Sequence, residues 1–424
     1  MRPSRWMVLA VVCLLYATVQ AAEVRKLGQG DLEWGVGTTT SPAGKVVTKI
    51  NAGIIPISLG DNTLTVNDAL TSVIDVRAYG ALGNNEDYTT ELQAAIDAAE
   101  VTAATDGVNK IVFMPPGTYK ITGQLLIPHG VRLVGSGARS TIIRVNATFA
   151  ALTSTGAIRI GDGTAGVFGS SVEHLYLDCN NIAGSIGIYS TDVQDNSGVK
   201  DVLINNFLAF GIKFDGGSGT FGSVNDFYIV NTEVYKSNTG GAGGVGVYIE
   251  DGTFGGDIRN VVVFGRTSHP LTAGYQIVNF PGILYKVSCD GDGATAGTDC
   301  IKIDSTAGAV STYGVLSNFW TNTIHTSSLY QVVAINTYRT ASAGGTNTIL
   351  DDGASGSTAI TITDSQVPLF VRGATKAQFN GIKSFSDIIL SSPSYGVIMT
   401  NAYDNATKRV GLNPAGDGFV FTDP

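Results

Sequence analysis

The chain has 424 residues, of which 54 are glycine and 14 % are charged, and it carries a net charge of −9 with a pI near 4.9. Nucleic-acid binding needs a basic face, so this balance disfavours nucleic acid as a partner. Few segments have helical periodicity, while Thr, Ser, Asn, Val and Ile are frequent between the glycines. This pattern predicts many short strands joined by turns rather than several ordinary domains.

The N-terminus has the features of a secretory signal peptide. Arg2 and Arg5 precede an apolar run, Trp6 to Tyr16, that is too short to span a bilayer comfortably, and small residues follow near Ala21. We therefore expect residues 1–21 to be removed and the mature protein to be secreted or held at the cell surface. No later stretch resembles a membrane span, and residues 22–72 form an N-terminal extension.

One segment, residues 87–105, predicts a helix. Leu92, Ile96 and Ala99 recur at helical spacing, and Glu91 lies in the first turn, where negative charge is favoured. A short strand and a turn that contains Pro115 and Pro116 follow. This helix lies where the N-terminal cap of a stack of strands belongs, because an uncovered end would invite edge pairing.

Beyond about residue 150 two sequence elements alternate. An apolar residue, any residue, a polar turn former and then apolar-x-apolar recur at 172–177, 199–204, 224–229 and 258–263. A small residue followed by apolar-x-apolar recurs at 187–189, 211–214, 246–249, 274–277 and 300–303. A repeat of about 24 to 35 residues with two strand types predicts an all-β solenoid, a right-handed parallel β-helix. We place it at residues 73–375, followed by a tail, 376–424, that caps the stack or mediates oligomerisation.

The opening of this region resembles that of the pectate-lyase-like superfamily. The resemblance rests on Ile74–Ala81, the helix, Pro115–Tyr119 and Val131–Gly137, in that order. This superfamily includes rhamnogalacturonase-type enzymes and phage tailspike depolymerases, so the resemblance implies a parallel β-helix that acts on polysaccharides. It does not imply one activity, because a fold does not fix a function.

The catalytic motifs of related hydrolases are incomplete. Polygalacturonase-like enzymes carry paired aspartates before a Cys-Ile strand, and here the pair reads Thr298-Asp299 before Cys300. The Gly-His-Gly and Arg-x-Lys signatures are absent, since His269 and His325 lack flanking glycines. Asp299 alone matches the family pattern.

The repeat register permits a separate search for a site. In the second strand type, the residues that face outward are Tyr189, Lys213, Tyr248, Gln276 and Lys302, and two residues further on stand Thr191, Asp215, Glu250, Val278 and Asp304. We interpret Asp215, Glu250 and Asp304 as candidate catalytic carboxylates, and Tyr189, Lys213, Tyr248 and Lys302 as candidate substrate-binding residues. Asp215 and Glu250 should lie about 4.8 Å apart, near the spacing of a retaining glycosidase pair, whereas Glu250 and Asp304, about 9.6 Å apart, approach the spacing of an inverting pair. The alternative is that an outward stripe is polar only because it meets solvent.

Three further features have structural alternatives. Cys289 and Cys300 could close a disulfide loop worth about 3 kcal/mol, or could be two small buried residues. His174, Asp201, Asp226 and Asn260 form a predicted ladder at a turn, where such side chains usually satisfy backbone groups. The segment with Asp290 and Asp292 could bind calcium, but it lacks the other ligands of a recognised calcium loop, so the alternative is an exposed loop and we expect no cofactor.

The sequence therefore favours a secreted glycoside hydrolase or polysaccharide lyase whose partner is a polysaccharide. The alternative is a non-catalytic adhesin or tail-fibre-like protein that binds glycans or forms an extracellular assembly. A homotrimer is compatible with either, by analogy with tailspikes.

Overall fold

The computed structural model describes side chains for residues 73–100, 109–216, 224–236, 239–252, 255–293, 296–304, 309–327 and 337. Backbone is also described for residues 101–106, for the hairpin β1 (Pro56–Leu59) and β2 (Asn62–Thr65), and for strands between 332 and 422. The expected signal peptide lies outside the described residues. In the part that the structure describes, no helix is both long and apolar enough to cross a membrane.

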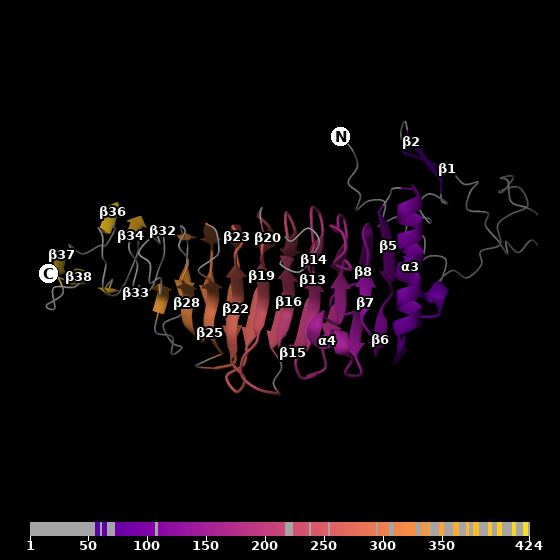
Figure 1. The fold of residues 1–424 in the computed structure, drawn as a ribbon, viewed down its shortest axis with the longest axis horizontal. Coiled ribbons are helices and arrows are strands. Elements are labelled where there is room, and N and C mark those ends of the chain that lie inside the picture. The colour runs from indigo at the N-terminus through magenta and orange to yellow at the C-terminus, as the bar shows by residue number, and fades with distance from the viewer. Residues whose placement is uncertain are drawn as a thin grey trace, which may run out of the picture. The chain divides into compact units, whose positions relative to one another are not determined.

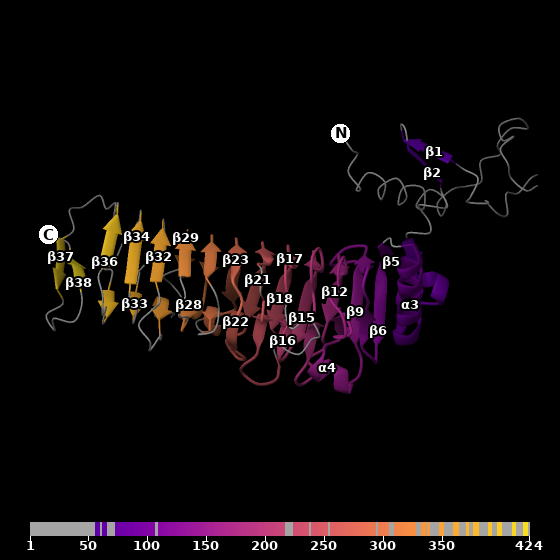
Figure 2. The same cartoon turned by 45° about the horizontal axis from the view of Figure 1, so that its top comes forward.

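Contacts divide the chain into two units, Met1–Ile74 and Asp75–Pro424. Strand β3 (Val73–Asp75) spans this division, and the short helix η1 (Val76–Tyr79) and β4 (Asn84–Asp87) come next along the chain. Three sheets of mainly parallel strands follow, and the chain visits them in turn (Figures 1 and 2).

Sheet I contains β3, β5 (Lys110–Met114), β8 (Val131–Gly135), β11 (Ser171–Glu173), β14 (Gly198–Lys200), β17 (Tyr228–Val230), β20 (Asp257–Arg259), β23 (Gly282–Tyr285), β26 (Val310–Tyr313), β29 (Val332–Ile335), β32 (Ala359–Thr363), β34 (Lys376–Asn380) and β36 (Val397–Thr400). Sheet II contains β4, β6 (Gly117–Ile121), β9 (Thr141–Val145), β12 (Tyr176–Asp178), β15 (Leu203–Phe207), β18 (Glu233–Lys236), β21 (Val262–Gly265), β24 (Ser288–Gly291), β27 (Leu316–Ser317) and β30 (Tyr338–Arg339). Sheet III contains β7 (Leu125–Ile127), β10 (Ile158–Ile160), β13 (Ile186–Ser190), β16 (Phe210–Asp215), β19 (Val245–Glu250), β22 (Leu271–Val278), β25 (Gly297–Ile303), β28 (Trp320–Thr326), β31 (Asn347–Asp351), β33 (Phe370–Arg372), β35 (Ile389–Ser391), β38 (Phe419–Thr422) and β37 (Arg409–Leu412).

Apolar side chains of each coil point inward and stack on their counterparts in the next coil. In sheet III this buried column contains Ile158, Ile188, Ile212, Val247, Tyr275, Ile301 and Ile324. Burying each Ile or Val contributes about 1.5–3 kcal/mol, and the repeat supplies such residues in all three sheets. The architecture is therefore the right-handed parallel β-helix that the repeat predicts.

Helix α3 (Thr89–Asp106) packs against β5, β7 and β8, where the sequence placed a capping helix (Figure 1). It begins at Thr89 rather than at Asp87, because Asp87 ends β4 and accepts hydrogen bonds from Thr89 N (3.1 Å) and Oγ1 (2.7 Å). Leu92 and Ile96 face the stack and are fully buried. A second, short helix, α4 (Ala150–Ser154), lies beside β13.

The parallel pairing continues past residue 375, the expected end of the stack. Strand β34 pairs with β32, and β36 pairs with β34, both in parallel. Strands β37 and β38 then pair antiparallel. The repeat pattern fades in this segment, although its strands still add to sheets I and III.

One prediction of register was wrong. The corner between sheets I and II is formed by His174, Asp201, Asn231 and Asn260, each with φ between 52° and 54°, so Asp226 does not belong to this ladder. The segment 224–229 has the right residue pattern, but Val199 pairs with Ile229 rather than with Val224. The chain makes an additional turn before β17, and a pattern this short cannot distinguish the turn from the corner.

Candidate functional site

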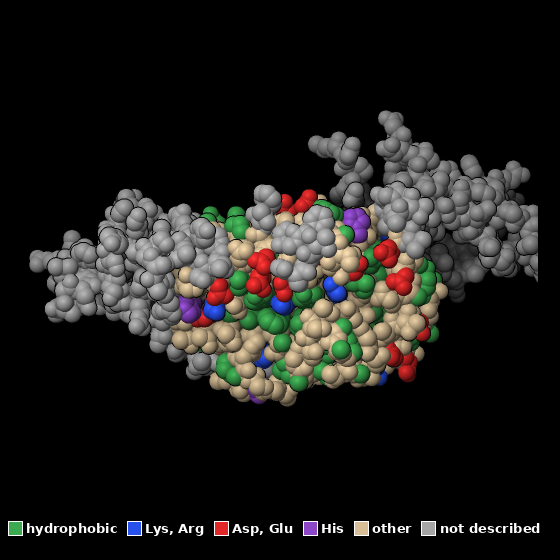
Figure 3. All heavy atoms as spheres, viewed as in Figure 1, with side chains coloured by type: hydrophobic (Ala, Val, Ile, Leu, Met, Phe, Trp, Pro, Cys, Tyr) green, Lys and Arg blue, Asp and Glu red, His purple; other side chains and the backbone are tan. Residues whose placement is uncertain are grey.

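The outward face of sheet III carries the predicted stripe in the predicted register. Tyr189, Lys213, Tyr248, Gln276, Lys302 and His325 are successive partners across the strands. In the second row, Asp215 pairs with Glu250, and Glu250 pairs with Val278. Figure 3 shows acidic and basic side chains gathered in a row across this face. Because neighbouring strands lie about 4.8 Å apart, the structure brings Asp215 and Glu250 together as vertical neighbours.

Both lysines of the stripe form ion pairs with aspartates of their own strand. Lys213 Nζ lies 2.7 Å from Asp215 Oδ2, and Lys302 Nζ lies 3.1 Å from Asp304 Oδ1. Gln276 donates a hydrogen bond of 2.7 Å to the other oxygen of Asp304. All these groups are half-buried, so the stripe presents paired charges with little net charge.

Tyr248 interacts electrostatically with all three carboxylates. Its hydroxyl donates a hydrogen bond of 2.5 Å to Glu250 Oε2. Burial raises the pKa of the Tyr248 phenol, and the hydrogen bond to Glu250 and the charges of Glu250, Asp215 and Asp304 raise it further, so the phenol stays protonated. Asp215 therefore has an ammonium partner, whereas Glu250 has a neutral phenol partner. Acid and base roles require such a difference between two carboxylates.

Tyr189 corrects one expectation. It occupies the predicted outward position, but only 5 % of its surface is exposed. The Arg159 guanidinium lies 5.9 Å from its ring centre and the Lys213 ammonium lies 5.7 Å from it. With two cations beside its ring and almost none of its surface exposed, Tyr189 contacts Lys213 rather than presenting an open face to a sugar.

A pair of an imidazole and a carboxylate extends the stripe, and the sequence motifs did not reveal it. His325 Nδ1 lies 2.9 Å from Asp299 Oδ2, and Asn322 donates a hydrogen bond of 2.6 Å to the other oxygen of Asp299. His325 lacks the glycines of the family motif, but it stands in the next outward position after Lys302. Extending the repeat by one coil would have found it.

The other candidates of the sequence are placed as follows. Cys289 and Cys300 are joined in a disulfide and are also fully buried, so both interpretations describe part of the structure. Asp292 accepts a hydrogen bond from Thr267 N (2.6 Å) and lies 3.4 Å from an Arg266 nitrogen. Among the described residues, no three His, Cys, Asp or Glu side chains gather as metal ligands.

Comparison with known proteins gives a family match. Residues 73–280 match the family described as rhamnogalacturonase A/epimerase, pectate lyase-like. A non-secreted LysM effector of Penicillium expansum is 38 % identical over 145 residues, which are 34 % of this chain and 11 % of that protein. The chain thus spans about a tenth of the length of that curated relative.

Two solved structures are similar at low identity. The catalytic unit of an α-1,3-glucanase from Streptomyces thermodiastaticus is 17 % identical with a TM-score of 0.48, over 78 % of this chain and 68 % of that one. The A-module of a mannuronan C-5 epimerase from Azotobacter vinelandii is 16 % identical with a TM-score of 0.44, over 78 % of this chain and 100 % of that one. Neither likeness says what this chain acts on.

Proposed function

We propose, from the match of residues 73–280 to the rhamnogalacturonase A/epimerase, pectate lyase-like family, that this protein binds and hydrolyses a glycan along the outward face of sheet III. The observation that carries the proposal is the row of Asp215, Tyr248, Glu250 and Asp304: Asp215 pairs with Glu250 across β16 and β19, and Asp304 directly follows β25, two strands further on. The signal-like residues 1–21 support action outside the cell.

The pairing of the carboxylates favours a retaining hydrolysis. Glu250, beside the neutral Tyr248 phenol, would donate a proton to the glycosidic oxygen as the bond to the anomeric carbon breaks. Asp215, beside the Lys213 ammonium, would attack that carbon and form a glycosyl ester. Water would then attack the anomeric carbon as the deprotonated Glu250 takes its proton, which breaks the ester, releases the sugar, frees the Asp215 carboxylate and returns Glu250 to its acid form. Tyr248 contacts Glu250 and acts as a positioning residue.

The charges of the site favour a neutral glycan. Elimination requires a uronate and a cation that neutralises it, but Lys213 and Lys302 are each already paired with an aspartate. A polyanionic glycan would also be repelled by a chain of net charge −9. Asp304, with Lys302 and Gln276, would therefore hydrogen-bond hydroxyl groups of a neighbouring sugar.

The experiment is incubation of the mature protein with neutral, pectic and algal polysaccharides. New reducing ends report hydrolysis, and ultraviolet absorbance of unsaturated products reports elimination. Asp215→Asn and Glu250→Gln are the test variants. Asp257→Asn is the matched control, because Asp257 forms a similar pair with Arg259 (3.0 Å) on sheet I.

The products separate the alternatives. Retained anomeric configuration, followed by nuclear magnetic resonance, supports Asp215 with Glu250, whereas inversion assigns Glu250 with Asp304. Unsaturated products would show that the reaction is an elimination, as in a lyase, and not a hydrolysis. Absence of cleavage together with glycan binding would favour the non-catalytic adhesin or tail-fibre-like alternative.

A further inference from the structure

A pocket of about 200 Å³ lies on a different part of the β-helix, at the corner between sheets I and II. Its polar lining consists of Arg139, His174, Asp201, Asn231 and Glu233. It is smaller than the roughly 300–1,000 Å³ of pockets for drug-sized ligands and suits one small ring. The stripe on sheet III does not contribute to it.

The floor of the pocket is built from the corner ladder. His174, Asp201 and Asn231 occupy the same corner position on three consecutive coils. Their backbone N–H groups donate to carbonyl oxygens of the following coil, at 3.0 Å in each case. The sequence led us to expect that these side chains hydrogen-bond the backbone. The backbone N–H groups already have backbone partners, so the side chains are not needed for that purpose. They are directed instead toward one another and the pocket.

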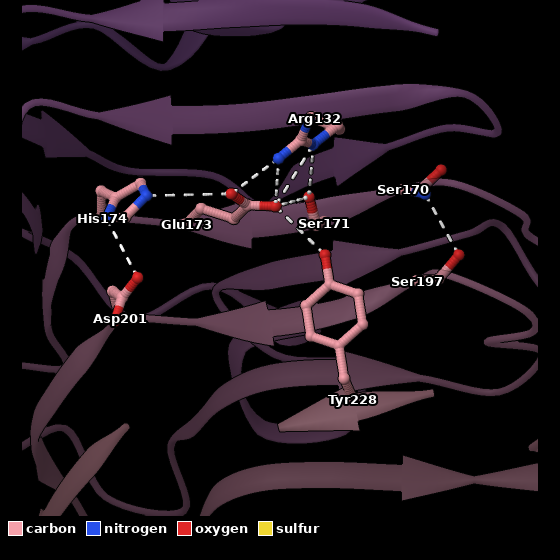
Figure 4. A network of polar contacts seen from close by, with 8 residues as sticks. All are labelled: Arg132, Ser170, Ser171, Glu173, His174, Ser197, Asp201 and Tyr228. Atoms are coloured by element: carbon pink, nitrogen blue, oxygen red, sulfur yellow. Dashed lines mark hydrogen bonds and ion pairs between the residues drawn. The ribbon is translucent and has the colours of Figure 1, made fainter. Parts of the chain in front are cut away.

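A buried network fixes the imidazole of His174 (Figure 4). His174 Nδ1 lies 3.3 Å from Asp201 Oδ2, and its Nε2 lies 4.0 Å from Glu173 Oε2. Glu173 is 1 % exposed and is held by Arg132 (2.7 Å) and by the Tyr228 hydroxyl (3.1 Å). The ring is therefore oriented before any ligand arrives, which is what a binding site requires.

The space for this network depends on Gly198. Gly198 pairs with Ser171 on one side and with Tyr228 on the other, so a side chain there would stand between them. Without one, Tyr228 reaches across β14 and donates to Glu173 on β11. The arrangement therefore links three coils beneath the pocket.

The opposite wall is also held in place. Tyr235 donates a hydrogen bond of 3.1 Å to Glu233, and its ring stacks on Phe264 at 5.2 Å. Burial, with the neighbouring Glu233 charge, raises the pKa of Tyr235, so this donor stays protonated. Arg139 is exposed at the other side of the pocket.

We propose that this corner pocket is a second glycan-binding site and that it takes a neutral sugar ring. A uronate would meet the carboxylates of Asp201 and Glu233, and an amino sugar would meet the Arg139 guanidinium. Carboxylate and amide acceptors beside guanidinium and imidazole donors match adjacent hydroxyl groups, which both donate and accept. The inference rests on the proposed function only in taking a glycan as the ligand. Such a site would hold a long chain at a distance from the row on sheet III.

The test is affinity electrophoresis of the full chain in gels that contain galactomannan, xyloglucan, dextran, polygalacturonate or soluble chitosan. The test variants are His174→Asn and Glu233→Gln, and the first preserves the corner because Asn231 and Asn260 adopt the same backbone conformation at this corner on later coils. Glu86→Gln is the matched control for Glu233→Gln, since Glu86 is exposed on β4 and does not line the pocket. Circular dichroism establishes that each variant is folded.

We expect a gel that contains a neutral glycan to retard the wild type and the control. The apparent Kd for that glycan should rise at least tenfold in both test variants. Asp215→Asn should lose cleavage but keep retardation, so failure of the row and failure of the pocket are distinguishable. Unchanged retardation in folded test variants, retardation by polygalacturonate or chitosan alone, or none in any gel would overturn the proposal.

Discussion

Glu173→Gln tests whether the buried network on sheet I is electrostatic in origin. The substitution preserves shape but removes the charge that faces Arg132. In the wild type, the Glu173 carboxylate accepts hydrogen bonds from Arg132 (2.7 and 2.8 Å), from Ser171 (2.8 Å) and from Tyr228 (3.1 Å). An amide can accept at only one of its two terminal atoms, so part of this set must be lost.

The magnitude follows from the exposure of the two partners. Breaking a fully buried ion pair costs about 3–5 kcal/mol. Glu173 is 2 % exposed at its side chain, but Arg132 is 35 % exposed and can regain water when its partner is neutral. We therefore expect Glu173→Gln to lower the free energy of unfolding by about 2 kcal/mol at pH 7, within the range for hydrogen bonds to charged groups.

The effect should depend on pH. Burial raises the pKa of Glu173, but the Arg132 charge and the hydrogen bonds outweigh burial, so its pKa lies below the ordinary 4.5. Because the pKa is lower in the folded than in the unfolded chain, this stability is present above about pH 4.5 and is lost as pH falls through the folded value. The wild type and the variant should therefore converge in acid.

Urea unfolding followed by circular dichroism at pH 7, 5 and 3.5 measures this difference. Glu86→Gln is the control, because Glu86 is exposed on β4 and should unfold like the wild type. Equal stability of Glu173→Gln and wild type at pH 7, or a difference that stays constant down to pH 3.5, would refute the electrostatic account.

Three further predictions concern stability. Gly198→Ala should lower the free energy of unfolding by more than about 2 kcal/mol, because the added Cβ would lie 2.0 Å from a backbone oxygen of the next strand and the backbone φ is 153°. Gly241→Ala is the control, since Gly241 has open space around it and its substitution should leave the urea unfolding curve unchanged. Reduction of Cys289–Cys300 should lower stability by about 3 kcal/mol, as expected for closing a short loop, and Cys300→Ser should show the same loss without reductant. Burial lowers the pKa of Lys236 to about 8 from 10.5, so between these pH values the unfolded chain binds more protons than the folded chain. The free energy of unfolding of the wild type, relative to Lys236→Met, should therefore rise by about 1–2 kcal/mol from pH 8 to 9.5. A difference that does not change with pH would contradict this.

The repeat in the sequence was sufficient to predict the β-helix and the register of the row on sheet III. Alternating apolar residues must face the core of a solenoid, so Lys213, Tyr248 and Lys302 must face outward. That argument predicts the direction in which a side chain points, but not whether neighbouring groups bury it. Tyr189 faces outward as predicted yet is buried, and the cationic groups of Arg159 and Lys213 lie beside its ring.

The corner pocket could not be predicted for a related reason. Glu173 occupies an outward position, and its burial depends on Tyr228, which lies 55 residues away and reaches it only because Gly198 has no side chain. The Asn231 corner was missed because the residues that precede β17 imitate the repeat. Local sequence patterns predict which residues form a strand and which face of the sheet each side chain occupies. Contacts between coils depend also on how many residues lie in each turn, which such patterns do not give.

The most direct test of the central claim is the rate at which Glu250→Gln releases reducing ends from a neutral polysaccharide that the wild type cleaves. If Glu250 is the acid of the row on sheet III, the rate should fall at least about 100-fold, the usual contribution of general acid catalysis, while Asp257→Asn keeps the wild-type rate. A folded Glu250→Gln variant that cleaves at the wild-type rate would contradict the account and move the chemistry away from this face.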